Sequence, residues 1–397
     1  MKQKEFKVLG TPEKKSKLTL SVIAAIAVIA ITIGAGFYWI HYSQQSEKIK
    51  ADKEIGESTI VPKLQHAVDS LLRDELEMIG GLQGQAIVME VQTGKILAMV
   101  GLERNLNGCY QLCNNIAYQQ ELGEFAMAAS LLAALETGTV KLSDVVNVGN
   151  GVLTIGKGID LKDHNWHCGG YGELTIGRAL EMHSNIGIGK AVVRAFSTNQ
   201  QAYFDKLNEM SYGQPIDIAG VEGLKPTTYS SPEDPLWVKR NIWQSAIGYG
   251  RKIAPIQMLT FYNAIANGGK MMKPTLHPNN IEVINSQIAS KENIDSVRIA
   301  LEYVVSQGLG KKTATPLMKV AGQGSTSQVN EYYGDNDEMI PEFQMGFCGY
   351  FPVEKPQYSM IVSMNKIAYP ANGGAFAGPV FSAIAEWMFN HGMISKL

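Results

Sequence analysis

The sequence carries little net charge, and this shortage limits the partners that the protein can have. Its 397 residues have a formal net charge of −2, and only 18% of them are charged. Domains that bind nucleic acid usually present a strongly basic surface, so nothing in this composition favours a nucleic-acid partner. The chain also has no internal repeat and no low-complexity tract. These absences leave one large globular domain or two small ones.

Cysteine is also scarce, and its spacing does not suggest a metal centre. The chain has four cysteines, Cys109, Cys113, Cys168 and Cys348. The first two are separated by three residues, which is not a zinc-binding signature. They could bridge within a loop, and free buried thiols are an equally open alternative. We therefore predict no metal and no cofactor.

One long apolar run is present near the start of the chain. Residues 18–40 are mostly apolar, and about 20 such residues in a helix cross the roughly 30 Å core of a bilayer. Six lysines precede the run: Lys2, Lys4, Lys7, Lys14, Lys15 and Lys17. Because positive charge stays on the cytoplasmic side, the rest of the chain is predicted to be extracytoplasmic. The alternative is a cleaved signal peptide, although the run is long for one.

This run predicts a simple domain organisation. We expect a cytoplasmic tail over residues 1–17, a single transmembrane helix over 18–40, a polar linker over 41–59 and one domain over 60–397. The expected location is the inner (cytoplasmic) membrane, with the C-terminal domain outside the cytoplasm.

The pattern of apolar residues in this domain predicts an early hairpin and late strands separated by helices. Residues 64–79 form a helix with one apolar face, and residues 85–91 and 95–100 form two strands joined by a turn. Further helices are predicted over residues 124–136, 174–195 (notched by Gly187 and Gly189), 256–266, 296–305 and 378–389, and late strands over 317–321, 342–349 and 358–364. This order indicates an α/β protein with one mixed or antiparallel sheet.

Four stretches in this domain resemble a known family. They read AIVMEVQTGKILAMV (86–100), QSAIGYG (244–250), GYFPVEKPQY (349–358) and GGAFAGPVF (373–381). In this order they resemble the transpeptidase domain of class B penicillin-binding proteins. The resemblance covers about residues 60–390 and implies the fold shared with serine β-lactamases, a mainly antiparallel sheet flanked by helices.

The resemblance also implies a chemistry, covalent acyl transfer. In the family, a serine attacks the penultimate carbonyl of a peptidoglycan stem peptide, and a lysine one helical turn later takes the serine proton. An S-x-N motif and a K-T-G strand complete the site. The first motif falls on residues 118–127, where Glu124 stands at the serine position and Met127 at the lysine position. A carboxylate forms no stable ester here, and a thioether accepts no proton.

The other two motifs are altered as well. His183 stands at the serine position of the second motif, whereas Asn185 is kept. In the third motif Gln323 replaces the lysine, which removes the cation that faces the substrate carboxylate, while Gly324 replaces the threonine and Ser325 the glycine. The residues left to bind a ligand without covalent chemistry are Ser184, Asn185, Gln323, Gly324, Ser325 and Thr326.

His183 is the histidine with the clearest expected place in the site. The resemblance places it in the former cleft, where it would pair with Glu124 and form one polar cluster with Gln323. Such a pair could fill an inactive cleft, or it could perform acid–base chemistry.

Other segments imitate catalytic or metal motifs. Ser363 and Lys366 are spaced as S-x-x-K, but they lie at the end of a predicted strand, where residues three apart point to opposite faces. Lys312 and the two residues after it imitate K-T-G within a predicted solvated turn. In residues 163–168, His164, His167 and Cys168 look metal-like but are too close in sequence to complete a site, and a capping loop is expected instead.

These observations favour a membrane-anchored, transpeptidase-like domain without an intact acyl-transfer site. We expect a scaffold or regulator in peptidoglycan synthesis or cell division, with other envelope membrane proteins as partners. One alternative is a noncovalent sensor of peptidoglycan stem peptides. Another is an enzyme that uses Glu124 and His183 in an unrelated reaction.

Overall fold

The structure, a computed structural model, describes residues 58–333 and 338–395. All of them belong to one compact unit, Ser58–Leu397. The apolar run over 18–40, the tail before it and most of the linker lie outside the described residues. Within 58–333 and 338–395, no helix is long and apolar enough to cross a membrane.

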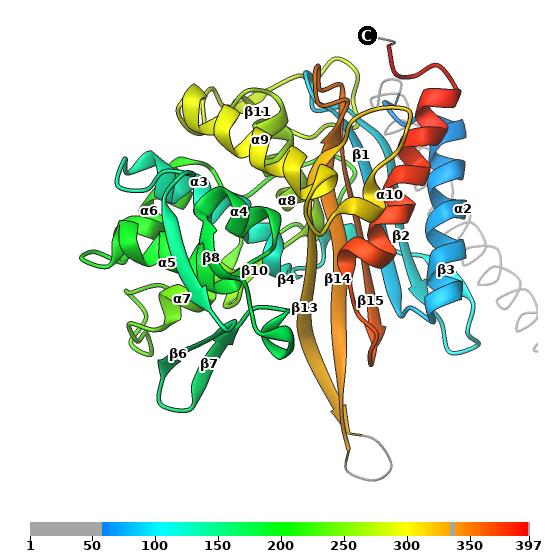
Figure 1. The fold of residues 1–397 in the computed structure, drawn as a ribbon. Coiled ribbons are helices and arrows are strands. Elements are labelled where there is room, and N and C mark those ends of the chain that lie inside the picture. Colours follow the sequence, from blue (N-terminus) through cyan, green and yellow to red (C-terminus); the bar gives the residue numbers. More distant parts are fainter. Residues whose placement is uncertain (1–57, 334–337, 396–397) are drawn as a thin grey trace, which may run out of the picture. The chain divides into compact units, whose positions relative to one another are not determined.

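A six-stranded sheet forms the centre of the domain (Figure 1). Its order is β13-β14-β15-β1-β2-β3, and every neighbouring pair is antiparallel. The strands are β1 (Gln83–Glu90), β2 (Ile96–Arg104), β3 (Tyr110–Leu112), β13 (Ala321–Tyr333), β14 (Met339–Phe351) and β15 (Tyr358–Ile367). The mainly antiparallel sheet expected from the resemblance is therefore present, and β13 is one of its edges.

Helices cover both faces of this sheet. Alternate residues of β1 point to opposite faces, so Ala86 packs in the core beneath α2 (Pro62–Ile79) and α10 (Gly373–Asn390), and Ile87 in the core beneath the remaining helices. Figure 1 shows α2 and α10 side by side on one face and the helical part of the molecule on the other. The helical part contains α3 (Ala126–Glu136), α4 (Ile176–Glu181), α5 (Asn185–Phe196), α6 (Gln201–Glu209), α7 (Asn241–Ala246), α8 (Pro255–Ala266) and α9 (Lys291–Ser306).

Short strands and 3₁₀ turns connect these helices. The small sheets have the orders β4-β10-β9, β11-β12, β5-β8 and β6-β7. Their strands are β4 (Gln120–Glu121), β5 (Val145–Gly149), β6 (Val152–Gly156), β7 (Ile159–Lys162), β8 (Gly172–Thr175), β9 (Thr228–Tyr229), β10 (Arg251–Ile253), β11 (Met271–Met272) and β12 (Val283–Asn285). The 3₁₀ turns are η1 (Asn115–Ala117), η2 (Gly123–Phe125), η3 (Trp166–Cys168) and η4 (Lys311–Thr313).

The early hairpin and the long helices are confirmed, and the helical region predicted over 174–195 is present as α4 and α5, but the notch predicted at Gly187 and Gly189 was wrong. The chain breaks between α4 and α5 at His183, whose φ of 48° is left-handed. The side chain of Ser184 then caps α5 by accepting the N–H of Gly187. Gly187 lies inside α5. A Cβ at this position would lie 2.4 Å from the Ala179 Cβ of α4. This glycine marks a close helix contact rather than a break.

The strand predicted over 317–321 was also wrong, because β13 begins only at Ala321 and continues to Tyr333. Much of β13 consists of glutamine, serine and threonine, which do not give an apolar pattern. Its inward-facing hydroxyls instead bind backbone carbonyls: the Ser325 Oγ donates to the Leu122 oxygen, and the Ser327 Oγ donates to the Glu121 oxygen. These two side-chain bonds attach β13, which pairs with the next strand β14, to a distant part of the chain.

The hypothesis of a Cys109–Cys113 bridge is also excluded. Both thiols are free, and the extended strand β3 lies between them. An extended chain rises about 3.3 Å per residue, which separates these cysteines by far more than the roughly 7 Å limit for a disulfide.

Packing beneath α2 predicts a stability difference along one helix. Leu72 is fully buried, whereas Met78 is 73% exposed. Leu72→Ala should lower the free energy of unfolding by about 2–5 kcal/mol, because it removes buried methyl groups and leaves a cavity. Met78→Ala should change it by less than about 0.5 kcal/mol. Denaturant unfolding would measure both, and equal effects would contradict this packing of α2.

Candidate functional site

Three segments that are distant in sequence meet at one edge of the central sheet. Glu124 lies in η2, just before α3. His183 lies in the turn between α4 and α5. Gln323 and Thr326 lie in β13. We call Glu124, Met127, His183, Gln323 and Thr326 the candidate site.

The Glu124 carboxylate binds the edge strand itself. Its Oε2 accepts the backbone N–H of Thr326 at 3.1 Å and lies 3.7 Å from the His183 Nδ1. The second distance is within ion-pair range but too long for a hydrogen bond. Both side chains are largely buried, with 19% and 8% of their surface exposed. The predicted Glu124–His183 pair is therefore present, and the carboxylate also occupies a main-chain donor on β13.

Gln323 forms no direct hydrogen bond with Glu124 or His183 in the part of the chain that the structure describes, so its place in the predicted three-residue cluster stays a prediction. Its Nε2 lies 3.9 Å from the Met127 Sδ, and both residues are fully buried. A thioether sulfur is only a weak acceptor, and the Gln323 Oε1 is buried without a hydrogen-bond partner. Met127 and Gln323, which stand at the two predicted lysine positions, thus contact each other. Met127 lies one helical turn after Glu124.

Ser184 and Asn185 hold the turn in place. The Ser184 Oγ donates to the Asp163 Oδ2 at 2.7 Å, and the Ile186 N–H donates to the Asp163 Oδ1 at 3.0 Å. The Asn185 amide donates to the Lys162 carbonyl. Burial raises the pKa of Asp163, and the nearby Glu124 charge raises it further. These polar groups therefore fix the start of α5, which places His183.

The predicted binding positions on β13 are engaged by the protein's own atoms. The Thr326 Oγ1 accepts the N–H of Gly373 at the start of α10. A Cβ at Gly324 would lie 3.3 Å from the His183 Cε1. The Ser325 hydroxyl donates to the Leu122 carbonyl at 2.6 Å. Ligand binding at these positions stays a prediction, and each of them already has an internal contact.

The backbone before Glu124 is held by close packing. Gly123 has a positive φ of 54°, and a Cβ there would lie 2.8 Å from the Ser327 Cβ. A Cβ at Gly248 would lie 2.1 Å from the Gly123 oxygen. Only glycine fits at these approaches, so the direction in which Glu124 leaves the backbone is fixed.

The metal-like segment performs a structural role. The Asp163 carboxylate accepts the Ile186 N–H beside the Ser184 cap of α5, and the His164 Nε2 lies 2.9 Å from the Tyr171 hydroxyl. Burial is the main cause that raises the pKa of Tyr171 to about 12 and lowers the pKa of His164. Among the residues that the structure describes, no group of three or more His, Cys, Asp or Glu side chains is placed to hold a metal ion. The sequence pointed to this loop, but not to the contact of Asp163 with the start of α5.

The two imitated motifs are not catalytic pairs. Ser363 accepts the side-chain N–H of Gln344 in the middle of the sheet, and Lys366 donates to the carbonyls of Ala368 and Pro370. Thr313 is fully buried, so the expected solvated turn over 312–314 is wrong at that residue. A Cβ at Gly378 would lie 2.4 Å from the Thr313 Oγ1, which shows that the turn packs under α10.

Comparison with known proteins identifies the family. The family model for the penicillin binding protein transpeptidase domain matches residues 84–386. This chain belongs to the penicillin-binding protein transpeptidase family. The transpeptidase domain of penicillin-binding protein 3 from Burkholderia pseudomallei has a similar fold, with a TM-score of 0.72, 23% identity, and coverage of 86% of this chain and 98% of that one.

Two curated relatives of the transpeptidase domain are similar at the sequence level. Penicillin-binding protein PbpB from Mycolicibacterium smegmatis is 24% identical over 83% of this chain and 53% of its own length. Peptidoglycan D,D-transpeptidase FtsI from Escherichia coli K12 is 24% identical over 82% of this chain and 54% of its own length. The chain thus spans about half the length of these relatives.

The raised pKa of Asp163 predicts a pH-dependent component of stability. Between the usual aspartate pKa and the raised one, the folded protein holds a proton that the unfolded chain has lost. The free energy of unfolding should therefore fall as pH rises through that range. The side chain introduced by Asp163→Asn does not titrate, so this variant should flatten that part of the plot of unfolding free energy against pH. Urea unfolding between about pH 3 and pH 7 would measure it.

Asp160 supplies a matched control for this measurement, since it is exposed on β7. Asp160→Asn should keep the wild-type slope. If Asp163→Asn also keeps that slope, the buried carboxyl does not contribute as described.

Proposed function

We propose that this chain is a transpeptidase-fold domain that has lost acyl transfer and acts as a scaffold or regulator in peptidoglycan synthesis or cell division. The observation that carries the proposal is the bond from the Thr326 N–H to the Glu124 carboxylate. A glutamate at the predicted nucleophile position has no hydroxyl to acylate. It also occupies a donor on the edge strand with its own side chain.

The remaining chemistry of the site supports this proposal. Met127 and Gln323 contact each other where the family resemblance expects two lysines, and neither can take a proton from a nucleophile. The hydroxyl of Ser184 is committed to Asp163. Loss of the nucleophile alone lowers kcat by about 10⁶ in a serine hydrolase. The proposed role therefore depends on the surface of the domain rather than on turnover.

The names of the relatives support the setting of this role. The relatives include a peptidoglycan D,D-transpeptidase and a penicillin-binding protein, so cell-wall synthesis is the proposed process. The proposed partners are membrane proteins of the synthesis or division machinery. The apolar run over 18–40 supports a single membrane anchor with this domain outside the cytoplasm.

The second candidate is a noncovalent sensor of peptidoglycan stem peptides. Its support is the retained geometry, since β13 is an edge strand that could add a peptide strand. The Glu124 carboxylate weakens this alternative, because it already accepts the Thr326 N–H and its charge repels a ligand that ends in a carboxylate. An enzyme that uses Glu124 and His183 is a third candidate, supported only by the 3.7 Å pair.

Benzylpenicillin tests the loss of acyl transfer directly. After incubation, intact-mass measurement should show no covalent adduct, because the acylated serine is absent from the predicted position. A family member with an intact S-x-x-K motif is the positive control and should gain one adduct. A stoichiometric adduct on this chain would overturn the proposal, and peptide mapping would show which residue reacted.

A titration with a muropeptide that ends in D-alanine separates the scaffold from the sensor. The amide signals of Gly324, Ser325 and Thr326 should stay unchanged in the wild-type protein, because Glu124 blocks this edge. Glu124→Ala frees the Thr326 N–H and should allow shifts at these residues. Glu331→Ala, an exposed change farther along β13, is the control and should behave like wild type. Shifts in the wild-type protein would favour the sensor.

A further inference from the structure

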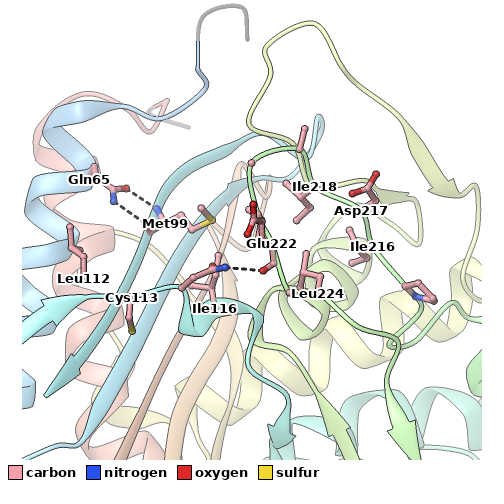
Figure 2. A pocket seen from close by; sticks show the side chains of 17 residues that line it. Gln65, Met99, Leu112, Cys113, Ile116, Ile216, Asp217, Ile218, Glu222 and Leu224 are labelled. Carbon is pink, nitrogen blue, oxygen red and sulfur yellow. Dashed lines mark hydrogen bonds between the residues drawn. The ribbon is translucent and has the colours of Figure 1, made fainter. Parts of the chain in front are cut away.

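A groove opens near the edge of the central sheet that lies opposite β13, between β2–β3 and the loop over residues 215–224 (Figure 2). Its volume is about 1120 Å³. Gln65 of α2, Met99 of β2 and residues 112–116 form one wall, and the loop forms the other. No residue of the candidate site lines it, so the groove is a separate feature of the surface.

The main chain on the β2 side of this groove is already hydrogen-bonded. The Gln65 side chain donates to the Met99 oxygen and accepts the Met99 N–H, both at 2.8 Å. The Cys113 N–H donates to the Gly101 oxygen, and the Asn114 side chain donates to the Glu222 oxygen. The part of β2 that lines the groove therefore offers no main-chain template, so on this side an occupant is recognised by side chains.

The side chains that line the groove combine an apolar floor with negative charge. Ile116 and Val221 are buried in the floor, and Leu112 is 71% exposed at the rim. Asp217 and Glu222 are exposed and form no ion pair with any residue that the structure describes. No lysine, arginine or histidine lines the groove. Its charge is thus of one sign, which favours a cationic occupant.

The groove continues beyond the loop. A neighbouring hollow shares Asn114, Glu222 and Gly223 with it, extends along residues 117–119 and is also lined by Lys225. A third hollow shares Tyr118 with the second and is lined by both Glu121 and Lys252, so the charge of one sign is confined to the first groove. This succession of hollows has the form expected for a stretch of polypeptide rather than for a small molecule.

We propose that this groove binds a segment of a partner protein that carries lysine or arginine between aliphatic residues. The aliphatic side chains would cover Ile116, Val221 and Leu112, and the cations would pair with Asp217 and Glu222. This inference does not rest on the proposed function, because it involves none of the residues at which acyl transfer is proposed to be lost.

Two matched synthetic peptides test the charge preference. The first reads Lys-Leu-Ala-Lys-Leu-Ala-Lys with both ends blocked, and the second has glutamate in place of each lysine. Cys113 lines the groove and its thiol is free, so its rate of alkylation reports occupancy at this place. The basic peptide should bind and slow alkylation of Cys113 without changing that of the exposed Cys168. The acidic peptide should do neither.

Charge-removing variants complete the test. Asp217→Asn combined with Glu222→Gln should weaken binding of the basic peptide by about tenfold, because two partly screened pairs are lost. Glu173→Gln combined with Glu233→Gln removes two exposed carboxylates outside the groove and should leave the affinity unchanged.

Three results would overturn the proposal. These are no binding of the basic peptide up to millimolar concentration, equal binding of the acidic peptide, or binding that leaves Cys113 alkylation unchanged. None of them would alter the outcome with benzylpenicillin, so failure of the groove and failure of the proposed function can be told apart.

Discussion

The joint between β13 and residues 121–124 is the constraint on which the rest of the site depends. Two serine hydroxyls of β13 bind the carbonyls of Glu121 and Leu122, and the Thr326 N–H between them binds Glu124. These bonds attach the edge of the central sheet to the start of α3. Since α3 is almost entirely buried within the helical part, its position relative to the sheet is fixed at this joint.

The same joint determines where the ionisable side chains of the site lie. The Glu124 carboxylate is placed by the backbone at Gly123, where a side chain would collide with β13. The approach of His183 from the opposite side depends on a left-handed residue, a conformation that costs on the order of 1–3 kcal/mol outside glycine. The hydrogen bond from the Ser184 hydroxyl to the Asp163 carboxylate stabilises that turn. The position of Glu124 is therefore fixed by the backbone at Gly123, and that of His183 by the turn before α5.

Much of this arrangement could be predicted, and the exceptions have a physical reason. The hairpin of β1 and β2 was predictable because its apolar residues and turn are local in sequence. The Glu124–His183 pair was predictable only through the family resemblance, since composition and spacing give no measure of distance between motifs. β13 was placed too early, because its many glutamine, serine and threonine residues hide the apolar alternation that marks a strand, and its pairing with β14 cannot be read from the sequence. His164, His167 and Cys168 looked metal-like because the sequence shows residue types but not the contacts that hold them, such as the His164–Tyr171 hydrogen bond.

The clamp that Gln65 forms on Met99 has a consequence for how the protein avoids misassembly. An exposed sheet edge is a template on which another chain can pair, and proteins commonly block such edges. Here a glutamine on α2 blocks β2, and a glutamate before α3 blocks part of β13 on the opposite side of the sheet. Rotation of the Gln65 side chain alone would free Met99, whereas β13 stays covered by the main chain of residues 121–124 even without the Glu124 bond. Edge-to-edge association at Met99 would thus begin with a side-chain motion, whereas at β13 the joint with residues 121–124 would have to open.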